Sequence, residues 1–151
     1  MNQRQCTECG AYLSDGAVCR DYLHTMIAWD FEDFTGVGKI HHVTVLSYNL
    51  QHPSVYSVRG LENAKQSLTE FIRNPTEYAV HGKRDTQNLA SDVRDWKITG
   101  TFEDHGVYTI KPRWQMLASD VVNGGLGKYL ENVKKWGASV LKDLEDSGNM
   151  Q

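Results

Sequence analysis

Long apolar runs are missing from this chain, and cysteines are few and confined to one place. No stretch reaches about 18 consecutive apolar residues, so the sequence contains no candidate for a membrane-spanning helix. All three cysteines fall between residues 6 and 19, and an odd number does not suit a disulfide framework. The opening residues, MNQRQCTECG, are polar and lack the apolar core of a secretory signal. We therefore expect a cytoplasmic protein with reduced thiols and no membrane partner.

The chain also lacks an excess of positive charge. Its formal net charge is −3, from 16 lysines and arginines against 19 aspartates and glutamates. Proteins that bind nucleic acid usually carry a basic surplus on at least one face, so this composition argues against such a partner. The nucleotide-binding and hydrolase motifs G-x-x-x-x-G-K-[ST], G-x-G-x-x-G and G-x-S-x-G are absent as well.

What is present suits one folded core. The chain has 151 residues, of which 40% are hydrophobic. That length and composition are typical of one domain, so we expect residues 1–151 to form it. Within this domain we expect residues 1–17 to form a loop knuckle packed on the rest, and residues 146–151 to be a frayed tail.

Helical periodicity dominates the hydrophobic pattern. Segment 40–51 is ambiguous, because its β-branched residues favour a strand, whereas its residue spacing and the stop at Pro53 favour a helix. We interpret it as a helix. A short β-hairpin near residues 97–110 is expected as a minor element. The predicted fold is therefore mainly α, a bundle of about five helices. Helices are expected at 18–33, 40–51, 60–73 and 128–145, and short ones near 89–96 and within 112–125, the latter capped by Ser119 or Asp120.

The cysteine spacing predicts a metal site. Cys6 and Cys9 are separated by two residues and followed by Gly10, which is the pattern of a zinc knuckle. The short gap lets both thiolates face one ion, and the glycine relieves the tight turn. Zinc prefers four ligands in a tetrahedron, so Cys19 is the natural third and a histidine must be the fourth.

Helix geometry selects His52 as that fourth ligand. If Cys19 begins the first helix, this helix rises about 20 Å, and the second helix returns by a similar length. Its C-terminal end, and hence His52, then lies level with Cys19. His41 and His42 lie at the far end, and His24 faces another side of the first helix. Four protein ligands leave no position for water, so we expect a structural Zn²⁺ held by Cys6, Cys9, Cys19 and His52.

Two other interpretations of the cysteines remain open at this point. They could be inert buried thiols, or two of them could form a redox pair, although the βαβ context of a thioredoxin-like motif is missing. Without His52 as a ligand, the zinc site would be open and hydrolytic chemistry would be conceivable.

A second polar site is conceivable at the other end of the helix pair. Glu32 and Asp33 end the first predicted helix, while His41 and His42 begin the second. A histidine–carboxylate pair there could perform acid–base catalysis or bind a second metal, so His41 and Glu32 are the candidate catalytic residues. His41, Tyr48 and His52 also share one helical stripe, which could line a pocket or simply form a helix contact.

Several segments of the chain match a known pattern: CTECGA, Cys19, HHVTVLSYNLQHPS, and the later segments ASDVV and VKKWGASV. With these segments the sequence resembles an uncharacterised family of small bacterial and archaeal proteins. Members of that family have C-x-x-C-G-A near the start and a segment like H-x-L-T-V-x-x-Y-x-x-Q-H-P. This chain departs from the pattern with Val43 in place of leucine and Leu46 in place of an acid. The resemblance implies a shared fold and a metal site but no reaction, and it carries over to Cys6, Cys9, His41, Tyr48, Gln51 and His52.

Together these observations predict a small zinc-binding protein that serves as a binding or interaction domain for an unknown ligand or protein partner. Its oligomeric state is unknown. The alternative is a metal-dependent, hydrolase-type enzyme that uses an open zinc site or a pocket at His41 and Glu32. A protein associated with nucleic acid is the weaker alternative.

Overall fold

The computed structural model describes residues 4–14, 16–32, 37–73, 100–101 and 103–150, and within these the chain is mainly helical. Five α-helices occur in this part of the chain, as the prediction of a mainly α fold requires. None of them combines the length and the apolar character that a bilayer span requires. The elements, in order, are β1 (Arg4–Gln5), β2 (Tyr12–Leu13), α1 (Arg20–Glu32), α2 (Val37–Leu50), the 3-10 helix η1 (Pro53–Val55), α3 (Val58–Arg73), α5 (Ala118–Asn123), the 3-10 helix η2 (Leu126–Lys128) and α6 (Tyr129–Asp146).

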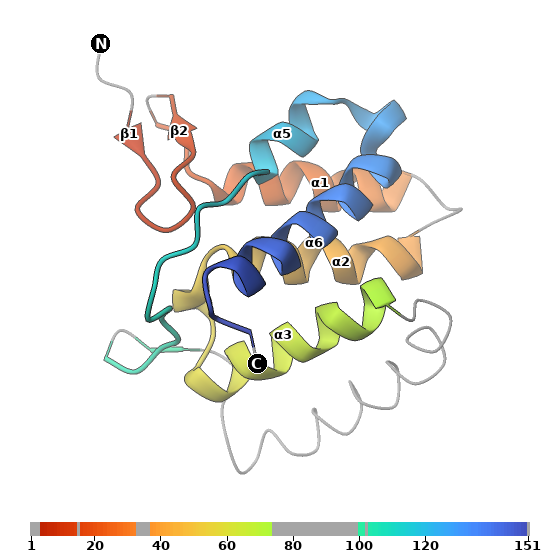
Figure 1. Ribbon diagram of the computed structural model, residues 1–151. Coiled ribbons are helices and arrows are strands. Elements are labelled where there is room, and N and C mark those ends of the chain that lie inside the picture. Colours follow the sequence, from red (N-terminus) through yellow and green to blue (C-terminus); the bar gives the residue numbers. More distant parts are fainter. Residues whose placement is uncertain (1–3, 15, 33–36, 74–99, 102, 151) are drawn as a thin grey trace.

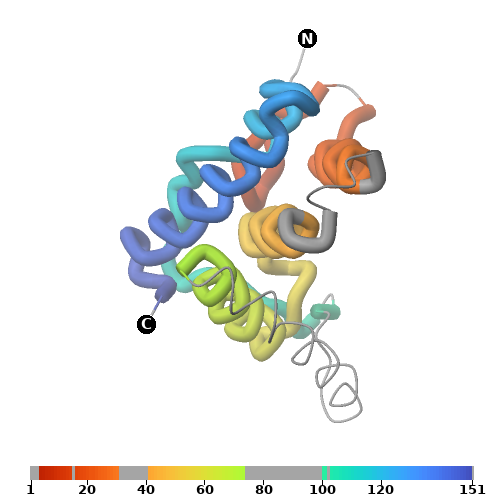
Figure 2. The backbone as a smooth tube through the Cα atoms, turned by 90° about the vertical axis from the view of Figure 1, so that its right-hand side faces the viewer, coloured from red at the N-terminus to blue at the C-terminus, as the bar shows by residue number. Residues whose placement is uncertain are grey.

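Helix α2 is the centre of the bundle. It contacts α1, α3 and α6, and Figure 2 shows it end-on between α1 and α3 with α6 running across one side. Close approach of α6 depends on Gly137, where an added Cβ would lie 2.8 Å from Cγ1 of Val43. Its central position explains why α2 buries polar as well as apolar side chains, including Thr44 and Ser47.

The helices predicted at 18–33, 40–51, 60–73 and 128–145 are confirmed to within three residues at each end. The short helix predicted within 112–125 is α5, but its N-cap is Leu117 and not Ser119 or Asp120. The apolar faces of α3 and α6 are buried as the 3.6-residue period requires, and they form much of the core. Asp143 differs from its neighbours on the polar side of α6. The helical period predicts that it faces water together with Lys134, Lys135 and Lys142, yet it is only 6% exposed, and its Oδ2 accepts a hydrogen bond of 2.9 Å from the backbone N–H of Gln115.

A short β-hairpin exists, but it lies in the N-terminal knuckle. Strands β1 and β2 pair antiparallel, with Arg4 opposite Leu13 and Gln5 opposite Tyr12, and they extend from the bundle near the start of α1 (Figure 1). The hairpin was expected near residues 97–110. Residues 100–101 and 103–110 contain no strand, and the predicted helix near 89–96 lies outside the described residues.

The described residues between Gly100 and Leu117 run across one end of the bundle and connect several elements. Backbone N–H groups of Gly100 and Gly106 donate to the carbonyls of Val55 and Tyr56 at 3.0 and 2.7 Å. The Tyr108 hydroxyl donates to the carbonyl of Leu50 at the end of α2. Gln51 donates through Nε2 to the carbonyl of Met116 at 2.7 Å. This connecting segment therefore fixes the chain around the end of α2, where the metal-ligand candidates lie.

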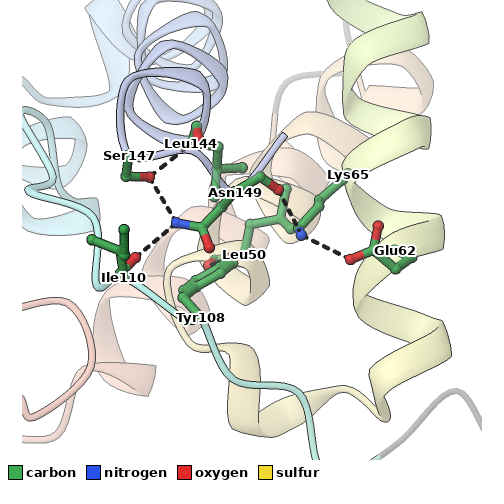
Figure 3. Close-up of polar contacts among 8 residues, drawn as sticks. All are labelled: Leu50, Glu62, Lys65, Tyr108, Ile110, Leu144, Ser147 and Asn149. Atoms are coloured by element: carbon green, nitrogen blue, oxygen red, sulfur yellow. Dashed lines mark hydrogen bonds and ion pairs between the residues drawn. The ribbon is translucent and has the colours of Figure 1, made fainter. Parts of the chain in front are cut away.

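The residues after α6 also make specific contacts (Figure 3). The carbonyl of Asn149 accepts a hydrogen bond of 2.8 Å from Nζ of Lys65, and its side chain donates to the carbonyl of Ile110 at 2.7 Å. Nζ of Lys65 also forms an ion pair with Oε1 of Glu62 at 2.8 Å, and it lies over the ring of Tyr108. A frayed tail was expected for residues 146–151, and these contacts would have to break for it to fray.

Candidate metal centre

The first two cysteines lie in the tight loop of the knuckle. The backbone N–H of Cys6 donates to the carbonyl of Ala11 at 2.8 Å, and the N–H of Gly10 donates back to the carbonyl of Cys6 at 2.9 Å. Gly10 has a φ of 85°, a conformation that favours glycine over every residue with a Cβ. The C-x-x-C-G spacing thus folds into a loop that turns the side chains of Cys6 and Cys9 toward one point.

The third cysteine immediately precedes α1. Helix α1 begins at Arg20, and Asp21 in its first turn accepts through Oδ2 a hydrogen bond of 2.9 Å from the N–H of Val18, just before the helix. Cys19 is thereby fixed at the helix start with its sulfur 3.4 Å from that of Cys9. A disulfide bond would require about 2.05 Å, so these are free thiols in close contact.

His52 reaches the same point from the end of α2. Pro53 cannot donate a backbone hydrogen bond, so α2 ends at Leu50, and His52 follows as the N-cap of η1. Nδ1 of His52 lies 2.7 Å from the carbonyl of Tyr48, and the Tyr48 ring stacks on the imidazole with centroids 4.1 Å apart. Because Nδ1 carries the proton in this arrangement, Nε2 is left as the ligand atom.

The four side chains meet in a compact cluster. The sulfurs of Cys6, Cys9 and Cys19 and a ring nitrogen of His52 all lie within 4.8 Å of one another. Zinc with Zn–S bonds of about 2.3 Å in a tetrahedron places two sulfurs about 3.8 Å apart, so the observed spacing suits such an ion. His52 is only 5% exposed, and its Nε2 has no hydrogen-bond partner of ordinary geometry in the described part of the chain. A buried, unpartnered nitrogen beside three sulfurs is the arrangement expected of a metal ligand.

The electrostatics of the cluster already favour one negative sulfur. The hydrogen bond from Cys19 lowers the pKa of Cys9 to about 4. Burial acts in the opposite direction, and His52 lowers this pKa further. The same hydrogen bond, with burial, raises the pKa of Cys19. Burial lowers the pKa of His52, but the nearby Cys9 sulfur and the Tyr48 carbonyl outweigh it and raise that pKa to about 9. Thiolate is the form of cysteine that binds metal, so the fold prepares Cys9 for that role.

Contacts outside the cluster fasten the knuckle to the bundle. Oε1 of Glu8, which lies between two cluster cysteines, accepts from the N–H of Ser54 at 3.0 Å. Nζ of Lys111 donates to the carbonyl of Thr7. The knuckle is therefore tied both to η1 and to the connecting segment.

In the second predicted site, the carboxylate beside His41 is Asp30 and not one of the acids that the sequence suggested. His41 lies at the far end of α2, as expected, but its Nδ1 is 2.8 Å from Oδ2 of Asp30. Asp30 is 2% exposed and accepts a second hydrogen bond of 2.7 Å from the hydroxyl of Tyr129, which lies 2.7 Å from Oγ1 of Thr44. The side chain of Glu32, and Asp33 altogether, lie outside what the structure describes.

Sequence reasoning missed Asp30, Tyr129 and Thr44 as a linked group. The sequence did contain a signal for Asp30. Its position falls on the same helical face as the buried Leu23 and Met26, where a charged residue is unusual. Its partner Tyr129 is 99 positions away, and the sequence contains no signal for that pairing. His41, Tyr48 and His52 have different partners: His41 pairs with Asp30, whereas the rings of Tyr48 and His52 stack together.

Comparison with known proteins identifies the family. A family model described as a family of unknown function, DUF5946, matches residues 4–145. The chain belongs to this family. The match includes all four residues of the metal-ligand cluster, so the candidate centre lies inside the DUF5946 region. No curated protein matches the chain, and no solved structure matches it either.

Proposed function

We propose that this protein binds one structural Zn²⁺ through Cys6, Cys9, Cys19 and His52. The observation that carries the proposal is the convergence of three thiols and one imidazole, from three separate parts of the chain, within 4.8 Å. Three sulfurs and one nitrogen form a common ligand set of structural zinc. When bound, the ion would supply a tetrahedral cross-link rather than chemistry at a substrate.

The arrangement favours a closed site over a catalytic one. Catalytic zinc keeps a position for water, whereas four protein ligands fill the tetrahedron. Cys9, Cys19 and His52 are buried, and Cys6 is partly buried, which limits access to the ion. The Nδ1 contact and the stacked ring of Tyr48 hold His52 in one orientation, as outer contacts do for metal ligands in general.

The wider role that we infer is a small, zinc-stapled binding or interaction domain of the cytoplasm. Free thiols in contact with one another suit a reducing compartment. The zinc would join the knuckle, the start of α1 and the end of α2, so it would stabilise one end of the domain as a scaffold for a ligand or partner.

Metal analysis of the purified protein tests the proposal. We expect one zinc per chain in the native protein, loss of that zinc in His52→Ala, and its retention in His52→Cys, which restores a fourth sulfur ligand. His24→Ala is the matched control, since His24 is exposed on α1. Unchanged zinc content in His52→Ala would remove His52 from the ligand set, and iron in place of zinc would refute the identity of the ion.

A second candidate function is general acid–base catalysis by His41. The observation in its favour is the buried carboxylate of Asp30 at 2.8 Å from Nδ1, which can orient the imidazole while 40% of the His41 side chain remains exposed. A hydrolase-type activity on p-nitrophenyl esters that disappears in His41→Gln, with unchanged zinc content, would support this candidate. Activity equal in both proteins would leave the Asp30–His41 pair as a link between α1 and α2.

A further inference from the structure

A cavity of about 300 Å³ opens between the connecting segment and the end of α6. We call it the C-terminal cavity; its lining residues are Ile110, Lys111, Arg113, Gln115, Asp143, Asp146 and Ser147. The volume is at the lower end of the range for small-molecule sites, so it suits a compact ligand rather than a nucleotide-sized cofactor.

The cavity has a buried acidic group with spare acceptor capacity. Asp143 is 6% exposed, and its Oδ2 accepts from the N–H of Gln115. Its other oxygen, Oδ1, has no donor among the residues that the structure describes. Burial raises the pKa of Asp143, and the hydrogen bond from Gln115 and the charge of Lys142 offset only part of that effect. A bound cation would offset more of it.

The opposite charge lines the same cavity. Arg113 is exposed, and within the described chain its guanidinium has no acceptor. No ion pair joins Arg113 to Asp143 or Asp146 in the described structure; Asp146 instead lies 3.7 Å from Nζ of Lys142. An acid and a base that line one cavity without pairing can each hold a different end of a ligand. Ile110, with 62% of its surface exposed, adds an apolar contact beside them.

We propose that the C-terminal cavity binds a small zwitterion of the α-amino-acid type, with its ammonium group on Asp143, its carboxylate on Arg113 and an apolar side chain against Ile110. Guanidinium is well suited to a carboxylate because it presents two parallel N–H donors. This site is separate from the zinc cluster. It gives the proposed binding domain a ligand class, and it holds whether or not zinc is bound.

Titration of the ¹⁵N-labelled protein with three related probes tests the proposal. L-leucine carries both charges, N-acetyl-L-leucine lacks the ammonium group, and L-leucine methyl ester lacks the carboxylate. We expect saturable shifts of the amides of residues 110–115 and 143–147 with L-leucine, at millimolar concentration for a ligand of this size. Each of the other two probes should bind at least about tenfold more weakly, because one charge-assisted contact is missing.

Variants then assign the two ends. Arg113→Gln should weaken L-leucine about tenfold or more, and Asp143→Asn should do the same while keeping an acceptor for Gln115. Lys135→Gln is the matched control, since Lys135 is an exposed base on α6 that does not line the cavity. Equal shifts from all three probes, no saturation up to about 50 mM, or unchanged binding in Arg113→Gln would each overturn the proposal. Zinc content is measured in the same samples, and we expect Arg113→Gln to leave it unchanged, which separates this test from that of the zinc site.

Discussion

At the scale of single residues, Tyr48 has two roles beside the cluster. Its carbonyl fixes the Nδ1 side of His52, and its ring covers one face of the imidazole at a centroid distance of 4.1 Å. The carbonyl role belongs to the backbone and survives any substitution. The ring role belongs to the side chain, so it can be tested alone.

Replacing Tyr48 with leucine should weaken zinc binding by about 10- to 100-fold, the range typical of residues that orient a metal ligand. Tyr48→Phe keeps the ring and should bind zinc as the native protein does. Competition with a chromophoric chelator measures both affinities, and the visible spectrum of the Co²⁺-substituted protein shows whether the ligand set is retained. Equal affinity of the leucine variant and the native protein would show that the carbonyl alone positions His52.

Protonation of the cluster sets a second expectation for these residues. The pKa of Cys19 is raised and that of His52 is about 9, so both carry a proton at pH 7, whereas Cys9, with a pKa of about 4, is already a thiolate. Metal ligands must be deprotonated, so zinc binding at pH 7 should release about two protons or more, and affinity should fall as the pH drops below about 9. Calorimetry in buffers of different ionisation enthalpy counts the released protons. Binding without proton release would contradict this order of protonation.

At the scale of elements, α3 and α6 follow from the sequence because each has one clear apolar face, whereas α2, which is buried on several sides, follows mainly from its length and its end. Pro53 ends α2, and the spacing of Leu61, Leu68 and Phe71 defines the buried face of α3. The position of the β-hairpin could not be predicted from the sequence. Strands β1 and β2 have two residues each, too few for an alternating pattern, and they exist because the knuckle loop closes on itself.

The candidate site likewise has one part that the sequence predicts and another that it does not. The four metal-ligand residues could be selected from spacing and helix length, since both depend only on local geometry. The Asp30–Tyr129 contact and the burial of Asp143 depend on which helices pack together, and no spacing rule contains that information.

Contact between α2 and α6 gives an element-scale prediction at Gly137. Alanine normally stabilises a helix relative to glycine by about 1 kcal/mol. Here its Cβ would lie 2.8 Å from Cγ1 of Val43 and 3.1 Å from Cδ1 of Ile72, and a β-branched valine in a helix has little freedom to move away. Gly137→Ala should therefore lower the free energy of unfolding by about 1–2 kcal/mol in urea denaturation. Gly127→Ala, where a Cβ meets no atom within 4 Å, is the control, and a stabilised Gly137→Ala would contradict this packing.

At the scale of the whole molecule, the cluster joins parts of the chain that the helical core holds less directly. The knuckle is otherwise fastened by a few polar contacts, including those of Glu8 and Lys111. The helices α2, α3 and α6 pack around their own apolar core. Metal loss should therefore affect one end of the molecule more than the other.

Removing zinc with a chelator should lower the melting temperature by about 10 °C, if free zinc is about 1,000 times its dissociation constant before removal. Hydrogen exchange should increase at residues 4–19 and 50–55 and change little along α3. Readdition of zinc should restore both measurements, and Mg²⁺ serves as a control because it prefers oxygen ligands. Uniform loss of protection over all helices would instead show that the core depends on the metal.

The order of the ligands along the chain has a consequence for how the molecule assembles. The three sulfurs come from a short N-terminal stretch, whereas the imidazole arrives only after a whole helical hairpin has been made. Closing a short loop costs less entropy than closing a long one, so the sulfur side can capture an ion first. We expect the docking of α2 against α1 to bring His52 to an ion that three sulfurs already hold. The last metal bond and the first tertiary helix contact would then form in the same step of folding.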